Sequence, residues 1–268
     1  MHRWANVTER QNLQPELAVS VIVFGFRKSQ PTSPSPCRTT PLPYRIVIPL
    51  VERIREPFRG RYALPGGPLE PALSLDESAA VTFNNATGLA GYQSGYQRGY
   101  QPQQMHTFGG LHRTPEQNEP SPGLRVVTVA YWTLLQLTDL DAAQQVAESD
   151  PHLSWWDIDD LPEMAFDHRH IIDQALETLR NVQLDTLAQA TLPSKFVLAD
   201  LRELAETIQG TRLDPGNFQR TIKNHPRIKP TGEFLEGTKH RPPRLYTLET
   251  TEALETTATP ETTEVNHD

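Results

Sequence analysis

The apolar positions in the first part of the chain fall in runs that predict β-strands. Val19 to Phe26 and Tyr44 to Val51 are rich in β-branched and aromatic residues, which favours strands. The prolines between these runs predict a long irregular loop. Residues 1–165 therefore predict a mixed α+β domain. The later apolar runs in this domain that favour strands are 105–112, 124–137 and 153–158.

Helical spacing of apolar positions begins at His168, where Ile171, Ile172, Ala175 and Leu179 recur along one helix face. A second helix is predicted from Ala199 to Ile208, and Gly210 after it suits a left-handed cap. A third, basic and polar helix is predicted for residues 216–224, before Pro226. Short apolar runs at 228–231 and 244–248 predict two paired strands. The second half is therefore expected to be mostly helical.

Charge changes this picture, because it differs sharply between segments. The 268 residues carry a net charge of −8, which by itself disfavours a nucleic-acid partner. Residues 1–193 carry −6, residues 194–248 carry +4 and residues 249–268 carry −6. The basic residues thus concentrate in the predicted helices and strands of the second half. The overall negative charge therefore does not exclude nucleic-acid binding by that half.

Cysteine content and hydropathy indicate the compartment. A lone Cys37 cannot form an internal disulfide, which favours a reducing environment. No apolar run approaches the roughly 18 residues needed to span a bilayer, and residues 1–15 do not resemble a signal peptide. We therefore expect a cytoplasmic protein with no membrane partner.

Two biased segments are predicted to lie outside the packed core. Residues 249–268 are rich in Thr and Glu and predict a disordered acidic tail, which either inhibits a basic surface or only aids solubility. Three Gly-Tyr-Gln copies begin at Gly91, Gly95 and Gly99. They favour a low-complexity loop over a surface that stacks nucleobases.

One motif, Leu64-Pro65-Gly66-Gly67 followed by a helix from about Leu75 and by Gly88-Leu89, resembles the signature of the Nudix fold. The signature fits without a gap when it starts at Gly67. Its acidic positions and its arginine position, however, hold neutral residues. These are Leu73, Val81, Thr82, Asn85 and Ala86. Nudix hydrolysis needs carboxylates on this helix to hold divalent metal against a pyrophosphate, so we expect no hydrolysis and no metal site.

Further segments extend the resemblance to the Nudix-related transcriptional regulators of the NrtR family. They are Gln104 to Gly109, Arg125 to Tyr131, Leu161-Pro162 and Phe166 to His168. In that family a Nudix-like α/β/α sandwich that senses a nucleotide is followed by a winged helix-turn-helix. The resemblance implies four segments: an effector-binding domain (1–165), a linker helix region (166–192), a DNA-binding domain (193–248) and the tail (249–268). Asp167, His168 and His170 are then interpreted as a structural helix start, not a metal site.

The resemblance also implies partners and functional residues. It implies a regulator, usually a repressor, of NAD or sugar metabolism genes that binds an operator as a homodimer and responds to an effector such as ADP-ribose, with no cofactor. Phe218 and Ile222 are predicted to face the core of the DNA-binding domain. The predicted DNA contacts are Lys195, Asn217, Arg220, Thr221, Lys223, Asn224, Lys239 and Arg241. The predicted effector contacts are Arg61, Tyr62, His106, Arg113 and Arg125.

Two other functions compete with this one. A metal-dependent hydrolase of ADP-ribose-type nucleoside diphosphates requires a replacement for the missing carboxylates. A protein-interaction module that has lost both ligands predicts binding of neither nucleotide nor DNA. The basic and polar residues of 217–224 argue against the second of these.

Overall fold

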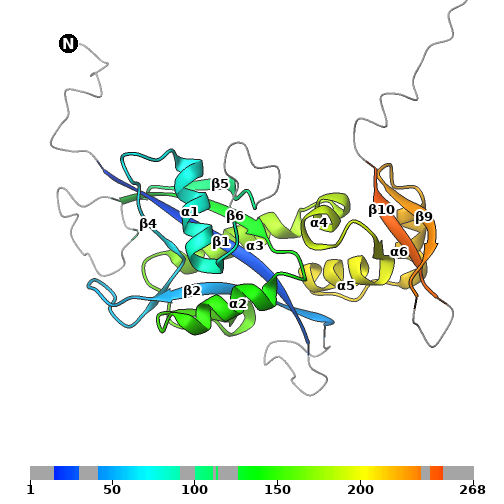
Figure 1. Ribbon diagram of the computed structural model, residues 1–268. Helices are drawn as coiled ribbons and strands as arrows, with labels where there is room; N and C mark the ends of the chain where they lie inside the picture. The colour runs from blue at the N-terminus through cyan, green and yellow to red at the C-terminus, as the bar shows by residue number, and fades with distance from the viewer. Residues whose placement is uncertain are drawn as a thin grey trace, which may run out of the picture.

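A computed structural model describes residues 15–29, 42–90, 100–110, 113, 126–236 and 242–249. Cys37, the first two Gly-Tyr-Gln copies, most of the proline-rich loop and residues 250–268 lie outside these residues. Tyr100 of the third copy is described, and its ring packs against Phe83 of the first long helix at 5.0 Å. Figure 1 shows an elongated molecule with a large sheet and its helices at one end and a smaller helical part with its own sheet at the other. Among the described helices, none combines the length and the apolar character that crossing a bilayer requires.

The large sheet has seven strands within the described residues. Its main path runs β3-β2-β1-β6-β5, with β4 paired to β1 and β7 paired to β2. The long central strand β1 runs parallel to β6 and antiparallel to β2, with Glu16 opposite Val126 and Gly25 opposite Val47. The strands are β1 (Glu16–Lys28), β2 (Tyr44–Glu52), β3 (Tyr62–Ala63), β4 (Gly66–Pro68), β5 (Gln103–Phe108), β6 (Val126–Leu134) and β7 (Leu153–Asp157).

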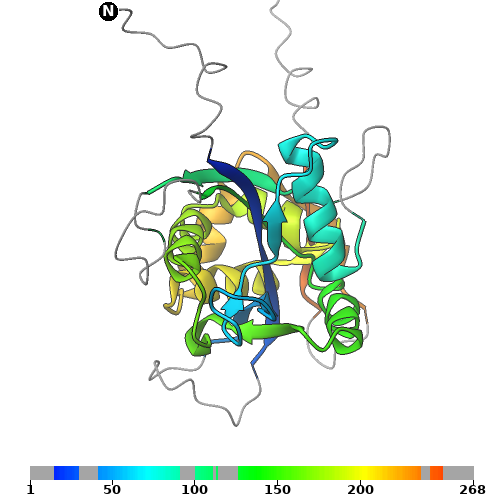
Figure 2. The ribbon, with the colours of Figure 1, turned by 90° about the vertical axis from the view of Figure 1, so that its left-hand side faces the viewer.

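Strand β1 is buried on both faces, and its alternating side chains enter two different cores. Val19, Val21 and Val23 pack in a cluster with α1 (Leu75–Thr87) and α2 (Leu140–Ser149). Ile22, Phe24 and Phe26 belong to a larger cluster on the opposite face, which includes α3 (His168–Arg180). Figure 2 shows α1 and α2 on one side of β1 and α3 on the other. The period of two thus produces the three layers of the predicted α/β/α sandwich.

The second part of the chain forms a winged helix-turn-helix. Its elements in order are α4 (Leu184–Thr191), β8 (Phe196–Val197), α5 (Leu198–Gln209), α6 (Pro215–Lys223), β9 (Ile228–Phe234) and β10 (Arg244–Leu248). The three strands form a small sheet in the order β8-β10-β9. The core of this part is continuous with the larger core beside β1, since Phe218 and Ile228 belong to the same cluster as Phe24. The two parts therefore pack as one body.

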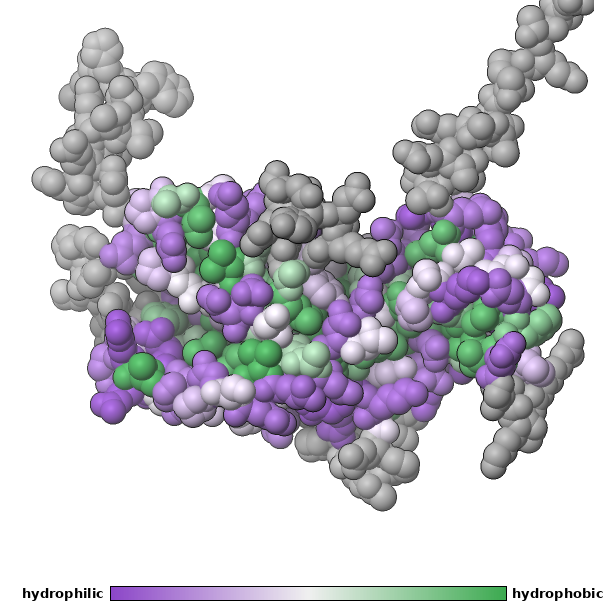
Figure 3. All heavy atoms as spheres, viewed as in Figure 1, coloured by the Kyte–Doolittle hydropathy of each residue, from purple (hydrophilic) through white to green (hydrophobic). Residues whose placement is uncertain are grey.

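Most predicted elements are confirmed, and several run longer than predicted. Helix α5 extends one residue beyond each end of the predicted helix, and β9 continues to Phe234. Gly210 has φ 71°, which confirms the left-handed cap. Helix α2 and the short helical turn Ile158–Asp160 were not predicted. Most of the face drawn in Figure 3 is hydrophilic, and the exposed large hydrophobic side chains among the described residues are Leu17, Ile54, Val81, Phe234 and Leu235.

Candidate nucleic-acid interface and effector site

Helix α6 is built to expose one polar face. Asp214 caps its N-terminus by accepting a hydrogen bond from the Asn217 N–H at 2.8 Å, and Pro215 occupies the first turn, where no N–H is needed. Phe218 and Ile222 lie one turn apart and are buried, as predicted. The opposite face consequently points away from the core. The predicted DNA contacts on this helix and just after it are all exposed: Asn217, Arg220, Thr221, Lys223 and Asn224.

Two of these side chains are oriented by Asn217. The Arg220 guanidinium donates to the Asn217 side-chain oxygen at 3.2 Å, and the Thr221 hydroxyl donates to the Asn217 carbonyl at 3.1 Å. Both bonds lie on the exposed surface, where water and polar ligands compete for the same groups. The structure therefore places amide, guanidinium and hydroxyl groups side by side on one short helix. These are the groups that read base edges and phosphates in a major groove.

The other predicted DNA contacts lie elsewhere. Strands β9 and β10 form the wing of this domain. The Lys195 ammonium, between α4 and β8, contacts both carboxylate oxygens of Glu233 on β9 at 2.7 Å. Lys195 thus ties the start of the domain to the wing, and its role in DNA binding stays a prediction. Lys239 and Arg241 lie outside the described residues.

Two basic residues of the wing were not predicted as contacts. The Lys229 ammonium donates to the His225 carbonyl at 3.1 Å, and the Arg244 guanidinium lies over the Phe234 ring at 5.9 Å. The sequence pointed to them only through the net positive charge of residues 194–248. That charge does not tell which lysines and arginines are placed to contact a ligand. Another arginine that was not predicted as a contact, Arg227, has a structural partner, since it pairs with Asp185 of α4 at 2.8 Å.

In the Nudix-like domain, the carboxylates beside the signature have structural partners. Ser74 and Glu77 form a capping box at the start of α1, with bonds of 2.8 and 3.2 Å. The Ser74 N–H donates to the Glu77 carboxylate at 2.8 Å, and this bond lowers the pKa of Glu77. Asp76 accepts a hydrogen bond from the Tyr131 hydroxyl at 2.6 Å, and burial raises the pKa of that tyrosine. Within the described ranges, no three His, Cys, Asp or Glu residues are grouped so that they could hold a metal. The donor set does not fit the metal that Nudix hydrolysis uses.

The Leu-Pro-Gly-Gly turn is fixed by contacts with β1 and α3. The Pro65 carbonyl accepts from the Val21 N–H at 2.9 Å, and any side chain at Gly66 would collide with the Val19 carbonyl. The Leu64 N–H donates to His168 Nδ1 at 2.9 Å. Burial lowers the pKa of His168 to about 4, so the ring is neutral at pH 7 and Nδ1 accepts. The structural interpretation of His168 agrees with this bond.

The predicted effector contacts Arg61 and Tyr62 lie beside the segment that leads into α3. The Arg61 guanidinium pairs with Glu163 at 2.9 Å and lies over the Phe58 ring at 5.1 Å. The Tyr62 carbonyl accepts from the Ala165 N–H at 2.7 Å. These contacts hold β3 against residues 163–165.

Arg113 contacts the same segment through Asp167. Its Nε and Nη2 atoms form two parallel bonds with the Asp167 carboxylate at 2.7 and 2.8 Å. Its Nη1 atom donates to the Thr128 hydroxyl at 2.8 Å and to the carbonyls of Phe108 and Val126 at 3.1 and 3.2 Å. Asp167 makes no capping bond to α3, because this arginine holds its carboxylate. The structure thus gives Arg113 a structural role beside its predicted one.

His106 lies on the edge strand β5 and is exposed. Its ring packs edge-on against Phe108 at 5.1 Å, and Phe108 packs in the same way against His170 of α3 at 5.9 Å. Arg125 lies outside the described residues. The described effector candidates are therefore all linked, directly or through Phe108, to residues 163–170 at the start of α3.

Comparison with known proteins agrees with this architecture. Residues 188–248 match the family model described as the NrtR DNA-binding winged helix domain. One similar solved structure is the crystal structure of Shewanella oneidensis NrtR complexed with a 27mer DNA, with 24% sequence identity and a TM-score of 0.63. The match spans 87% of this chain and 93% of that one. Another is the crystal structure of a MutT/nudix family protein from Enterococcus faecalis, with 20% sequence identity and a TM-score of 0.58. That match spans 92% of this chain and 95% of the other.

A curated relative, the ADP-ribose pyrophosphatase of Methanocaldococcus jannaschii, is 26% identical over 125 residues. The match covers 47% of this chain and 63% of that protein, so it spans less than two thirds of the relative. The solved structures show the fold, and the family model identifies the second domain. The chain has the fold of these Nudix-domain proteins, and its residues 188–248 match the NrtR DNA-binding winged helix domain.

Proposed function

We propose that this chain is a DNA-binding transcriptional regulator whose Nudix-like domain binds a nucleotide such as ADP-ribose without hydrolysing it. The match of residues 188–248 to a DNA-binding family carries this proposal. The exposed polar face of α6 supports it. The regulator acts in the cytoplasm as a homodimer on paired half-sites about 34–36 Å apart, and represses genes of NAD or sugar metabolism. Its domains follow the bounds predicted from the sequence, except that α4, which lies in the predicted linker region, packs against α5 and β10 of the DNA-binding part.

DNA recognition is tested by selection from a random-sequence duplex library with the full chain. We expect enrichment of one sequence motif. The variant Arg220→Ala should bind the enriched duplex about 10-fold to 100-fold more weakly, because one charged contact to a base or phosphate is worth about 1–3 kcal/mol. The matched control is Arg169→Ala, since Arg169 is an exposed arginine on α3 that pairs with Asp173. Failure to enrich any motif, or equal affinity of Arg220→Ala and wild type, would contradict the proposal.

Effector binding is supported by the Nudix-like fold and by the convergence of Arg61, Tyr62, His106 and Arg113 around the start of α3. Arginines bind pyrophosphate oxygens through paired hydrogen bonds. The relative's name, ADP-ribose pyrophosphatase, supports ADP-ribose as the first ligand to test. Binding of the effector shifts DNA affinity only as far as it favours one of two states of the protein.

The absence of hydrolysis is a separate prediction. With ADP-ribose and either Mg²⁺ or Mn²⁺, we expect AMP release at the rate of the protein-free control, because the signature positions offer no carboxylate to a metal. Calorimetric titration of ADP-ribose without metal should still show binding. Metal-dependent turnover at an enzyme-like rate would instead support the competing hydrolase.

A further inference from the structure

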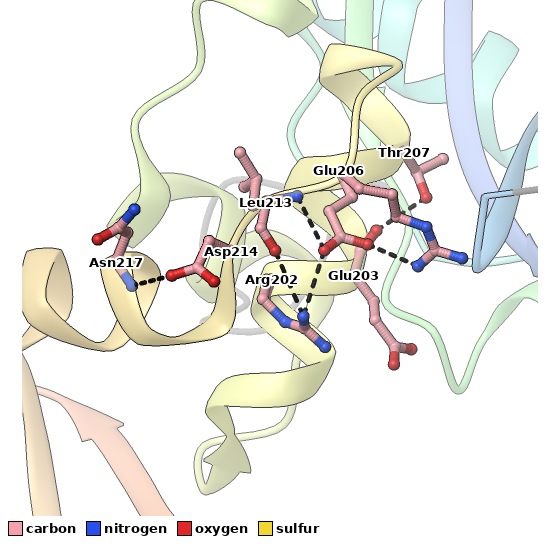
Figure 4. A network of polar contacts seen from close by, with 8 residues as sticks. Arg202, Glu203, Glu206, Thr207, Leu213, Asp214 and Asn217 are labelled. Atoms are coloured by element: carbon pink, nitrogen blue, oxygen red, sulfur yellow. Dashed lines mark hydrogen bonds and ion pairs between the residues drawn. The ribbon is translucent and has the colours of Figure 1, made fainter. Parts of the chain in front are cut away.

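Glu206 makes most of the hydrogen bonds that hold the turn between α5 and α6. Its backbone carbonyl accepts hydrogen bonds from the N–H groups of Gly210 and Thr211, the second at 3.2 Å. Its carboxylate accepts from the Arg212 guanidinium at 2.8 Å and from the Leu213 N–H at 3.1 Å. Figure 4 shows the side-chain contacts from close by. Every residue from 210 to 213 thus bonds to Glu206.

This carboxylate is fully buried, with 1% of its side chain exposed. A buried charge is costly unless it is paired and hydrogen-bonded. Here Arg212 pairs with one carboxylate oxygen, and Arg202, one helical turn before Glu206, lies 3.4 Å from the other. The Arg202 guanidinium also donates to the Leu213 carbonyl at 3.5 Å. Both polar groups of the Leu213 backbone are therefore held from α5.

Leu213 directly precedes Asp214, which caps α6. Helix α6 has nine residues, and only Phe218 and Ile222 are buried. Two side chains one turn apart fix which face of so short a helix is buried, but they leave its tilt to be set by its ends. The backbone that enters the helix is consequently the second point that fixes where its exposed face lies.

We propose that Glu206 is a positioning residue for DNA recognition, which sets the angle of α6 through the Leu213 backbone. This inference rests on the proposed DNA-binding function. Glu206 itself touches no DNA, because it is buried. It determines how well Asn217 and Arg220 meet base edges, and it leaves the number of phosphate contacts unchanged. Its loss should therefore reduce discrimination between sequences more than affinity for DNA in general.

The variant Glu206→Gln tests this proposal in the full chain. Glutamine has the same shape, but its amide group places N–H donors against the arginines. We expect affinity for the enriched duplex, corrected for the folded fraction, to fall about tenfold or more, as sub-ångström to ångström shifts in a contact surface do in other sites. Affinity for an unrelated duplex and the slope of log K against log salt should stay at the wild-type values.

A second variant tests the same proposal if Glu206→Gln does not fold, and a control variant changes a neighbouring glutamate. Arg212→Gln removes one partner that is half exposed, and it should reduce sequence discrimination in the same direction by a smaller factor. Glu203→Gln is the control, because Glu203 lies on α5 one residue after Arg202 and makes no side-chain bond to the turn among those described. It should bind as wild type does.

The outcomes separate the inference from the proposed function. If wild type enriches a motif but folded Glu206→Gln and Arg212→Gln discriminate as well as wild type, the positioning role is wrong and the regulator stands. The positioning role is also wrong if affinity for both duplexes falls equally, since that is the signature of a general loss of fold. If wild type enriches no motif, the proposed function itself fails.

Discussion

Replacing Arg113 with methionine is expected to lower the free energy of unfolding by about 3–5 kcal/mol, the usual cost of removing one partner of a buried ion pair. Arg113 and Asp167 are 12% and 19% exposed, so water reaches them poorly. Methionine fills a similar volume, but it leaves the Asp167 carboxylate without its two bonds. It also removes donors from the hydroxyl of Thr128 and from two backbone carbonyls.

Urea unfolding followed by circular dichroism measures this loss, and a matched pair is available on α3. Arg169 and Asp173 are 59% and 50% exposed, so Arg169→Met should change the free energy of unfolding by less than about 0.5 kcal/mol. In the double variant Arg113→Met with Asp167→Asn, part of the loss should return, because the uncompensated charge is gone. A loss near that of the Arg169 control would contradict the structural role. A purely ligand-binding Arg113 would instead leave stability intact and abolish the stabilisation by ADP-ribose.

Sequence reasoning succeeded where a local rule determines the structure. Helix α6 was predicted from residues within one short segment, with Phe218 and Ile222 on its buried face, although it begins at Pro215, one residue before the predicted start. The same holds for Gly210, whose left-handed backbone could be predicted from its place after an apolar helix. Such features need no knowledge of distant residues.

The contacts that hold the site together escaped prediction because they join distant residues. Arg113 and Asp167 are 54 positions apart, and Leu64 and His168 are 104 apart. Nothing near Arg113 distinguishes an arginine that binds a ligand from one that binds the protein. Helix α2 was missed because only Leu140, Ala143 and Ala147 are buried, which is a short and weakly apolar stripe. Glu206 did offer a signal, as a lone charge between the buried residues Leu204 and Ile208.

A second large change in the free energy of unfolding is expected when the pH is lowered, because His168 is then protonated more readily in the unfolded chain than in the folded one. Its pKa of about 4 in the folded protein lies below the ordinary value of 6.5, because burial disfavours the charged ring. Between these values the unfolded chain binds a proton that the folded chain does not, so stability falls as the pH drops. From pH 7 to pH 4.5 this group alone should remove about 2 kcal/mol. Protonation would also take Nδ1 away from the Leu64 N–H and release the turn from α3.

Because carboxylates titrate in the same range, the measurement compares variants by urea unfolding at both pH values. Glutamine at position 168 keeps an acceptor for Leu64 but does not titrate, so the stability of wild type relative to His168→Gln should fall by about 2 kcal/mol from pH 7 to pH 4.5. The control is His170→Gln, which replaces an exposed histidine on the same helix. A pH dependence of His168→Gln equal to that of wild type would show that the ring accepts a proton while folded. The neutral Nδ1 would then not be what holds the Leu-Pro-Gly-Gly turn to α3.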